Sequence, residues 1–293
     1  MKDVIIVTGG AGFVGSNLIT LLIKKTKFKI ISIDNYSTGK KNNQIKDRRV
    51  KYLVNHTKNI ATILKNKKKK IKVIFHFGEF SRIYQSFLNM NECIESNSVG
   101  SNAVFNFCLK NKIKLIYSAT SASLGNKGRD KNLSPYAFTK SKNLEMLENL
   151  KKWFKMKYEI IYFYNVYGPR QIEVGPMATV IGIFENFYRN KKPLPVVKPG
   201  TQSRRFTHIN DTVDICYLAW KRNKCQHYSI SNHKSFTIFQ VAKLFGPKIN
   251  LLAPRKGERY ASALTSISQS NKVHKYFGSL KLNDYVKDFI KKH

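Results

Sequence analysis

The chain has 293 residues, of which 42% are hydrophobic and 12% aromatic, and its formal net charge is +36. This composition suits one large folded domain, or a domain with a smaller one appended. No apolar run approaches the roughly 20 residues that cross a membrane, and no cysteine pair has the short spacing of a zinc site. We therefore expect no membrane segment and no metal.

The positive charge comes mostly from lysines that are scattered along the chain, with one dense run at residues 65–70. Arginine, which contacts phosphates and bases with two parallel hydrogen bonds, is not enriched. A compositional bias explains this pattern more simply than a nucleic-acid-binding surface, although an anionic small substrate would also suit it. The N-terminus lacks the long apolar stretch of a signal peptide, which predicts a cytoplasmic protein with reduced cysteines.

Short β-branched runs alternate with helical patterns over about the first 165 residues. The helical patterns include one that follows the first run and two more at 93–110 and 136–153. This alternation predicts an α/β fold with a doubly wound parallel sheet. The predicted strands are 4–8, 29–34, 72–77, 114–120 and 159–166.

The regular alternation of strand and helix patterns ends after "YGPR" (167–170), where prolines separate shorter elements. Proline interrupts both helices and central strands. A second, smaller region is therefore expected to begin near residue 166.

The glycine-rich stretch "TGGAGFVGS" (8–16) follows the first predicted strand and opens the first predicted helix. Asp34 ends the next strand, 19 positions after Gly15. This spacing is typical of a dinucleotide site, in which glycines admit the pyrophosphate and the acid accepts hydrogen bonds from a ribose diol. An acid there repels a 2′-phosphate, so NAD is favoured over NADP. The alternative, an ordinary glycine turn with Asp34 as a cap, explains fewer of these features.

Tyr136 and Lys140 lie one helical turn apart in "SPYAFTK" (134–140). A free tyrosine has a pKa of about 10, and a lysine cation on the same helix face favours the phenolate. Thr120, at the end of the preceding strand, could hydrogen-bond the reacting oxygen. Such a pair is more often structural when it stands alone, but beside a dinucleotide motif it predicts acid–base catalysis.

These motifs, together with "DNYSTG" (34–39), "HFGEFSRIYQS" (76–86), "YNVYGPRQ" (164–171), "QSRRFTHIND" (202–211) and "PRKGE" (254–258), resemble the extended short-chain dehydrogenase/reductase family. Within it, the sequence is similar to the nucleotide-sugar 4-epimerases. The resemblance implies a Rossmann domain at 1–165, completed by part of 204–226. It also implies a smaller nucleotide-sugar-binding region at 166–203 and 227–293.

The resemblance also implies a mechanism of transient oxidation at C4 of a UDP-linked sugar. Tyr136 would be the acid and base, Lys140 would bind the nicotinamide ribose, and Thr120 would hold the sugar 4-oxygen. Small Ser262 would leave room for a 2-acetamido group, which predicts an N-acetylhexosamine substrate with the plain hexose also accepted. The other implied cofactor contacts are Gly9, Gly12, Phe13, Val14, Gly15, Asp34, Asn35 and Asn97, and the other implied substrate contacts are Ser81, Asn165, Arg204 and Arg255.

The chain departs from the family pattern at three places. Asn55-His56 stands where Gly-Asp is usual, Arg205 replaces a common Asp, and only ten residues separate Gly125 from Tyr136. Apolar faces on the helices at 93–110 and 136–153 predict a homodimer, because two such helices per subunit pair in the resembling family.

Four alternatives remain open from the sequence. A related reductase, a dehydratase and an epimerase acting at another carbon would share most of these motifs. Dehydratases of the family carry Asp-Glu after the active-site Thr, whereas Thr120 is followed here by Ser121-Ala122. A non-catalytic RNA-binding relative would explain the +36 charge, but the intact Thr–Tyr–Lys set argues against it.

Overall fold

The computed structural model describes residues 3–66, 70–121, 131–246, 248–254 and 273–293. Within these ranges the main sheet has eight strands, all paired in parallel. Their order is β14 (Val273–Phe277), β11 (His227–Ser231), β6 (Tyr158–Phe163), β5 (Lys114–Thr120), β4 (Ile71–His76), β1 (Val4–Thr8), β2 (Lys29–Asp34) and β3 (Val50–Val54).

The strand order reverses direction between β1 and β4, because β1 pairs with β2 on one side and with β4 on the other. All five residues of β1 are buried, as expected for a central strand covered on both faces. In open parallel sheets, ligands bind outside the carboxyl ends of the strands at such a reversal point. The topology therefore places a binding crevice beyond Thr8 and His76.

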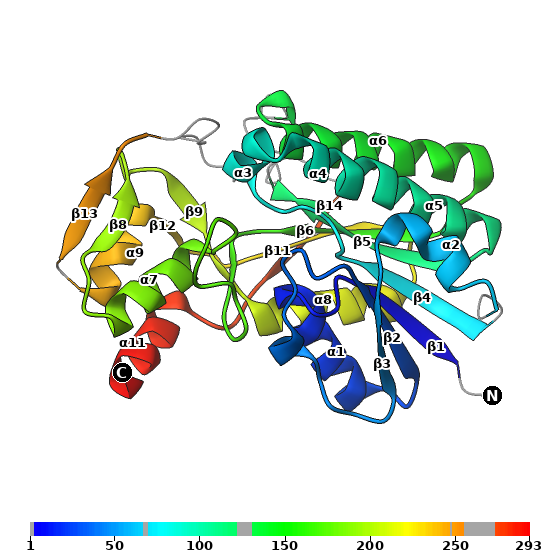
Figure 1. Ribbon diagram of the computed structural model, residues 1–293, viewed down its shortest axis with the longest axis horizontal. Coiled ribbons are helices and arrows are strands. Elements are labelled where there is room, and N and C mark those ends of the chain that lie inside the picture. The colour runs from blue at the N-terminus through cyan, green and yellow to red at the C-terminus, as the bar shows by residue number, and fades with distance from the viewer. Residues whose placement is uncertain (1–2, 67–69, 122–130, 247, 255–272) are drawn as a thin grey trace.

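Helices cover both faces of this sheet (Figure 1). The helices α1 (Phe13–Lys25) and α8 (Ile209–Arg222) pack on one face, where Leu18 and Val213 meet Ile5 of β1. On the other face lie α2 (Ile60–Ile63), α5 (Ser101–Lys110) and α6 (Pro135–Phe154). Two further helices, α3 (Ile83–Leu88) and α4 (Met90–Ile94), lead through a π-helical turn at Glu95–Gly100 into α5.

A smaller region stands at one end of the sheet, at the left of Figure 1, and has its own apolar core around Phe184, Phe206 and Phe245. Its helices and strands are α7 (Val180–Arg189), α9 (Ile238–Phe245), α11 (Leu282–Lys292), β8 (Leu194–Val197) paired with β13 (Ile249–Leu252), and β9 (Ser203–Arg205) paired with β12 (Ser235–Thr237). The pair β7 (Val166–Tyr167) and β10 (Thr207–His208) lies where the chain passes between the two regions.

The predicted α/β fold is confirmed, and the five predicted strands are present within a few residues of their expected ends. The predicted strand 159–166 divides at Tyr164 into β6 and β7, and the predicted helix 93–110 includes the π-helical turn. The division into 1–165 and 227–293 needs one correction, because β11 and β14 come from the second range and lie in the main sheet. The two-region division otherwise stays a proposal.

All four cysteines are unpaired, and Cys93, Cys108 and Cys216 are buried. None of the helices in the described ranges combines the length and apolar character needed to cross a membrane.

Candidate active site

A cleft of about 390 Å³ opens at the carboxyl edge of the main sheet. Its walls come from the segments that follow β1, β2, β4, β5 and β6, and from the first turns of α1 and α6. The cleft therefore lies at the reversal point that the strand order defines. It brings together most of the site residues predicted from the sequence, namely Gly9, Gly12, Phe13, Val14, Gly15, Asp34, Asn35, Ser81, Thr120, Tyr136, Lys140 and Asn165.

The glycine loop can adopt its path only without side chains at two positions. Gly9 has φ +69°, and a Cβ there would lie 2.8 Å from the carbonyl oxygen of Phe77. A Cβ on Gly15 would lie 2.1 Å from the carbonyl oxygen of Gly9. The loop delivers the N-terminus of α1 to the cleft, with Gly12 as its N-cap residue. Helix N-termini carry partial positive charge and unpaired N–H groups, which fits a dinucleotide pyrophosphate.

Asp34 is held in place at the end of β2 by the main chain around it. Its Oδ2 accepts a hydrogen bond from the Ala11 N–H (2.9 Å) and its Oδ1 accepts one from the Tyr36 N–H (2.8 Å). Burial raises the pKa of Asp34 above the usual aspartate value, and these backbone hydrogen bonds oppose that effect. The carboxylate faces the same cleft as Asn35, which fits a ribose diol as its ligand.

Helix α6 begins at Pro135 because its first turn is well capped, and this first turn lies at the cleft. The Ser134 side chain accepts a hydrogen bond from the Ala137 N–H (3.0 Å), and Pro135 occupies the first helical position. The Tyr136 N–H donates to Ser86 Oγ (3.2 Å), and its side chain packs in a small cluster with Phe80. These contacts fix Tyr136 at the wall of the cleft that the glycine loop also lines.

Lys140 lies one turn further along α6 and is nearly inaccessible to solvent, with 4% of its surface exposed. Its Nζ donates to Glu79 Oε2 at 2.5 Å and to the main-chain carbonyl of Ser118. The ammonium also lies 4.5 Å from the centroid of the Tyr117 ring. Burial lowers the pKa of Lys140, and the negative charge of Glu79 opposes that shift.

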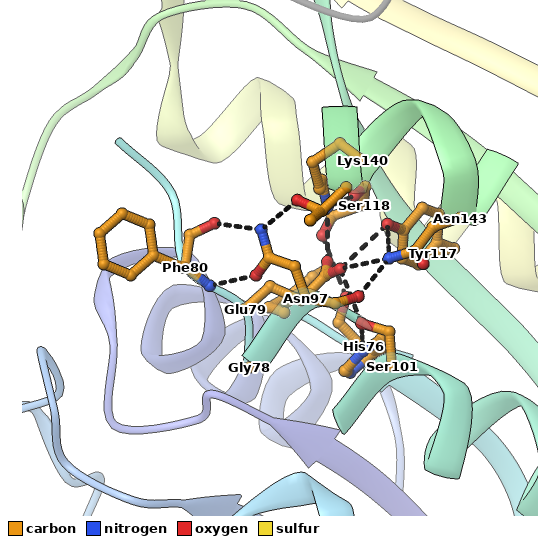
Figure 2. A network of polar contacts seen from close by, with 12 residues as sticks. His76, Gly78, Glu79, Phe80, Asn97, Ser101, Tyr117, Ser118, Lys140 and Asn143 are labelled. Atoms are coloured by element: carbon orange, nitrogen blue, oxygen red, sulfur yellow. Dashed lines mark hydrogen bonds and ion pairs between the residues drawn. The ribbon is translucent and has the colours of Figure 1, made fainter. Parts of the chain in front are cut away.

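Glu79 is the residue of the site that sequence reasoning missed. Figure 2 shows its carboxylate between Lys140 and three neutral donors. These donors, all bonded to Oε1, are Ser101 Oγ (2.8 Å), Tyr117 OH (3.0 Å) and Asn143 Nδ2 (3.2 Å). The available signal was an acid soon after a buried strand, in a chain with only 17 acidic residues.

His76 connects this network to the first strand. Its Nδ1 lies 2.7 Å from Thr8 Oγ1 and its Nε2 lies 3.0 Å from Ser101 Oγ. Burial lowers the pKa of His76 to about 4, so the imidazole is neutral near pH 7. It therefore supports the network through hydrogen bonds and adds no charge.

Asn97 and Arg204 lie outside the set of described residues that line the cleft. Asn97 is fully buried behind it, where its Oδ1 accepts from the Phe80 N–H (2.6 Å) and its Nδ2 donates to the Phe80 carbonyl (3.1 Å). It thus shapes the segment that carries Glu79 and Ser81. Arg204 lies in β9, and the predicted Arg255 and Ser262 lie outside the described residues.

Asn165 lines the cleft, and its Nδ2 donates to the Arg205 carbonyl (3.0 Å), which ties the cleft to the second region. Asn55 and His56, where the chain departs from the family pattern, also line the cleft.

Arg82 is a second cleft residue that the sequence did not single out. Its Nε donates to the Met177 carbonyl (3.0 Å) and its Nη1 to the Ser81 carbonyl (2.9 Å). Burial lowers the pKa of Arg82, whereas the nearby Tyr136 raises it. Within the described residues, no carboxylate lies within ion-pair distance of this guanidinium.

Replacing Asp34 by serine should weaken the binding of NAD by roughly ten- to hundredfold, because hydrogen bonds to a charged acceptor are lost. The same change should improve the binding of NADP, since the repulsion of its 2′-phosphate disappears. Calorimetric titration with each dinucleotide measures both effects.

Asp47→Ser is the matched control, because Asp47 pairs with Arg49 at a distance of 2.9 Å and does not line the cleft. Its two affinities should equal those of the wild type. Recovery of NADP from the purified wild-type protein would contradict the assignment of Asp34.

Comparison with known proteins places this site in a family. A UDP-N-acetylglucosamine 4-epimerase from Methanobrevibacter ruminantium M1, solved with UDP-N-acetylmuramic acid, is 25% identical over 99% of this chain and 98% of its own, with a TM-score of 0.83. A UDP-glucose 4-epimerase from Thermotoga maritima, solved with UDP-glucose, is 22% identical over 98% and 97% of the two chains, with a TM-score of 0.85. A Bacillus cereus UDP-glucuronic acid 4-epimerase, solved with NAD and a fluorinated UDP-glucuronic acid, is 22% identical over 99% of each chain, with a TM-score of 0.83.

The family model named "NAD dependent epimerase/dehydratase family" matches residues 5–264. This range includes the glycine loop, Asp34 and the Thr120–Tyr136–Lys140 set. The predictions of the family, the fold and NAD as the cofactor are thereby confirmed. The chain belongs to the NAD dependent epimerase/dehydratase family of enzymes.

Proposed function

We propose that this enzyme epimerises a UDP-linked sugar at C4, with UDP-N-acetylhexosamine as the preferred substrate and UDP-hexose also accepted. The observation that carries the proposal is the shared cleft. Thr120, Tyr136 and Lys140 line the same cleft as the glycine loop and Asp34, so an acid–base set faces the cofactor-binding elements.

Tyr136, Lys140 and Thr120 each have a separate role in the proposed reaction, which follows from their position. Tyr136 takes the proton of the sugar 4-hydroxyl and returns it after the ring has turned over. Lys140 holds a positive charge one helical turn away, which favours the phenolate form of Tyr136. Thr120, at the end of β5, hydrogen-bonds the 4-oxygen and keeps it near the phenol. NAD, when bound, supplies the acceptor and donor of the hydride at C4.

An elimination reaction is disfavoured because it needs an available carboxylate near the sugar. Ser121 follows Thr120 at the cleft, where dehydratases of the family carry an acid. Glu79 lines the cleft as well, but Lys140 occupies its Oε2 and three donors occupy its Oε1. Epimerisation, which uses one group to remove and restore the same proton, fits this set better.

Replacing Tyr136 by phenylalanine should lower kcat by about 10²–10⁴-fold, since the group that transfers the proton is lost. The fold and the affinity for NAD should be retained, because the ring and its packing with Phe80 remain. Steady-state kinetics with a nucleotide sugar, together with a calorimetric titration of NAD, measure the two effects.

Tyr164→Phe is the matched control, because Tyr164 is buried in the core of the main sheet and does not line the cleft. A Tyr136→Phe variant that turns over at the wild-type rate would exclude Tyr136 as the acid–base group.

The substrate preference is tested at Ser262. Ser262→Tyr should reduce turnover of UDP-N-acetylglucosamine by at least about tenfold while sparing UDP-glucose, because a large ring would fill the space for the acetamido group. A panel of nucleotide sugars, analysed for new isomers by chromatography, gives both rates. Conversion of plain hexose alone by the wild type, or equal loss of both reactions in the variant, would refute the size argument.

Arg82 favours a second candidate, a nucleotide sugar that carries a carboxylate. A cleft-lining guanidinium near Tyr136, whose Nε and Nη1 donate to neutral carbonyls, suits a negatively charged substituent. The Bacillus cereus enzyme described above acts on such a sugar. The same panel therefore includes UDP-glucuronic acid, and Arg82→Leu should reduce turnover of that substrate more than turnover of UDP-glucose.

We also propose a homodimer built on α5 and α6. A shallow groove between these helices is lined by Val99, Ala103, Leu150 and Phe154, and Trp153 beside it has 62% of its surface exposed. Exposed apolar clusters of this kind are typical of interfaces.

Light scattering at micromolar concentration should give twice the mass of one chain, and Phe154→Glu should reduce it to one. Lys151→Glu, a charge change on the same helix outside the groove lining, is the control and should leave the dimer intact. A wild-type mass of 33.8 kDa would contradict the proposal.

A further inference from the structure

We propose that Glu79 is a positioning residue for Lys140: its carboxylate keeps the Lys140 ammonium protonated and fixed at the cleft wall. The inference deepens the proposed function, because it rests on the role of Lys140 beside Tyr136. It adds a partner that the motif of Thr, Tyr and Lys does not contain.

The first support is the environment of the lysine. The side chains of Lys140 and Glu79 have 5% and 3% of their surface exposed, and their charged atoms lie 2.5 Å apart. The other contacts of Lys140 Nζ are a neutral carbonyl and the face of the Tyr117 ring. A buried ammonium loses its hydration, and only a nearby negative charge compensates for that loss. Among the described residues, Glu79 is the carboxylate that forms an ion pair with Lys140.

The second support is the way in which Glu79 is held. Its Oε1 accepts from Ser101 on α5, Tyr117 on β5 and Asn143 on α6, so three elements fix its direction (Figure 2). With Lys140 on Oε2, the carboxylate has four donors, which is about the number that an ionised carboxyl can accept. A fixed carboxylate in turn fixes the lysine, because Nζ must meet Oε2.

A purely structural pair elsewhere in the sheet provides the contrast. Lys114 and Glu159 lie at the starts of β5 and β6, at the opposite edge of the sheet, where Glu159 is the second residue of β6. Their Nζ and Oε1 atoms are 2.6 Å apart, and their side chains are 9% and 0% exposed. This pair is buried like the first, but it lies away from the cleft lining. The two pairs therefore separate the effect of burying a lysine–glutamate pair from the effect of placing it beside Tyr136.

Few other groups around the pair change charge near neutral pH. Burial lowers the pKa of His76 on β4 to about 4 and raises the pKa of Cys93 on α4 to about 11. Burial and the charge of Glu79 raise the pKa of Tyr117 on β5 well above its usual value. Between about pH 6 and pH 9 these three groups keep one protonation state. A changed pH profile in this range therefore reports on Lys140 and Tyr136.

Glu79→Gln keeps the shape of the side chain and removes its charge. Burial then lowers the pKa of Lys140 without the opposing charge of Glu79, so the lysine loses its proton at a lower pH than in the wild type. The alkaline limb of kcat/KM should move to lower pH, with activity falling about tenfold for each pH unit beyond that limb. The affinity for NAD, measured by calorimetry, should fall over the same pH range.

Thermal unfolding gives a readout that needs no substrate. In Glu79→Gln the unfolded chain binds a proton at Lys140 that the folded chain releases, so stability should rise as the pH rises toward the usual lysine pKa. If this rise and the NAD effect occur but no nucleotide sugar reacts, the pairing stands and the proposed function fails.

Glu159→Gln is the matched control. Its pH profiles of kcat/KM and of NAD affinity should equal those of the wild type, because the Lys114–Glu159 pair lies away from the cleft lining. Glu79→Asp, whose carboxylate is one methylene shorter, should move the alkaline limb in the same direction by a smaller amount.

The outcome decides between the two roles of Glu79. If Glu79→Gln has the wild-type pH profiles, or if Glu159→Gln shifts them equally, Glu79 is only structural. If Glu79→Gln does not fold, an unchanged alkaline limb in Glu79→Asp overturns the proposal in the same way.

Discussion

The reversal of strand order between β1 and β4 is the constraint on which the rest of the structure depends. Because β1 has β2 on one side and β4 on the other, the segments that leave their carboxyl ends diverge and open a crevice. The glycine loop, Asp34 and the segment around Glu79 all follow these strands. Each reaches the cleft without a long loop, so the rigid sheet sets the distances between the proposed cofactor-binding groups and the proposed acid–base groups.

The placement of the few acidic residues follows from the same constraint. The chain has 53 basic and 17 acidic residues, so each buried carboxylate leaves one fewer negative charge on a surface that has few of them. Asp34 and Glu79 stand at the carboxyl edge of the sheet, and Glu159 stands at the opposite edge. Each is bonded to several donors, as the cost of burying a charge requires. The surface is left strongly basic, which suits anionic substrates through long-range attraction.

The sequence predicts the central part of this arrangement because its signals are local. The strands β1, β2, β4, β5 and β6 are short, mostly buried runs rich in apolar residues, and the glycine loop and the Tyr–Lys pair are short motifs. The edge strands β3 and β14 consist of half-buried and exposed residues, so they lack the apolar pattern of a central strand. The short strand β11 is recognisable only once its neighbours in the sheet are known. None of the three strands therefore stands out in the sequence. Glu79 was missed because its partners lie 22 to 64 positions away, at a separation that no local pattern reports.

The separation of the two cores has a consequence for how specificity can arise. The proposed acid–base groups and cofactor-binding loop stand on strands and helices that pack in the cores of the main sheet, whereas the second region has its own core around Phe184 and Phe245. Substitutions in the core of the second region can therefore alter that region without changing the separate cores that support the main sheet. Within the described residues, the two regions are joined by the β7–β10 pair and by hydrogen bonds that include those from Asn165 to the Arg205 carbonyl and from Arg82 to the Met177 carbonyl. Function in such folds lies in the site and not in the fold. We therefore expect one scaffold to serve different sugars, and the solved structures that share this fold at 22–25% identity are indeed named for different sugars.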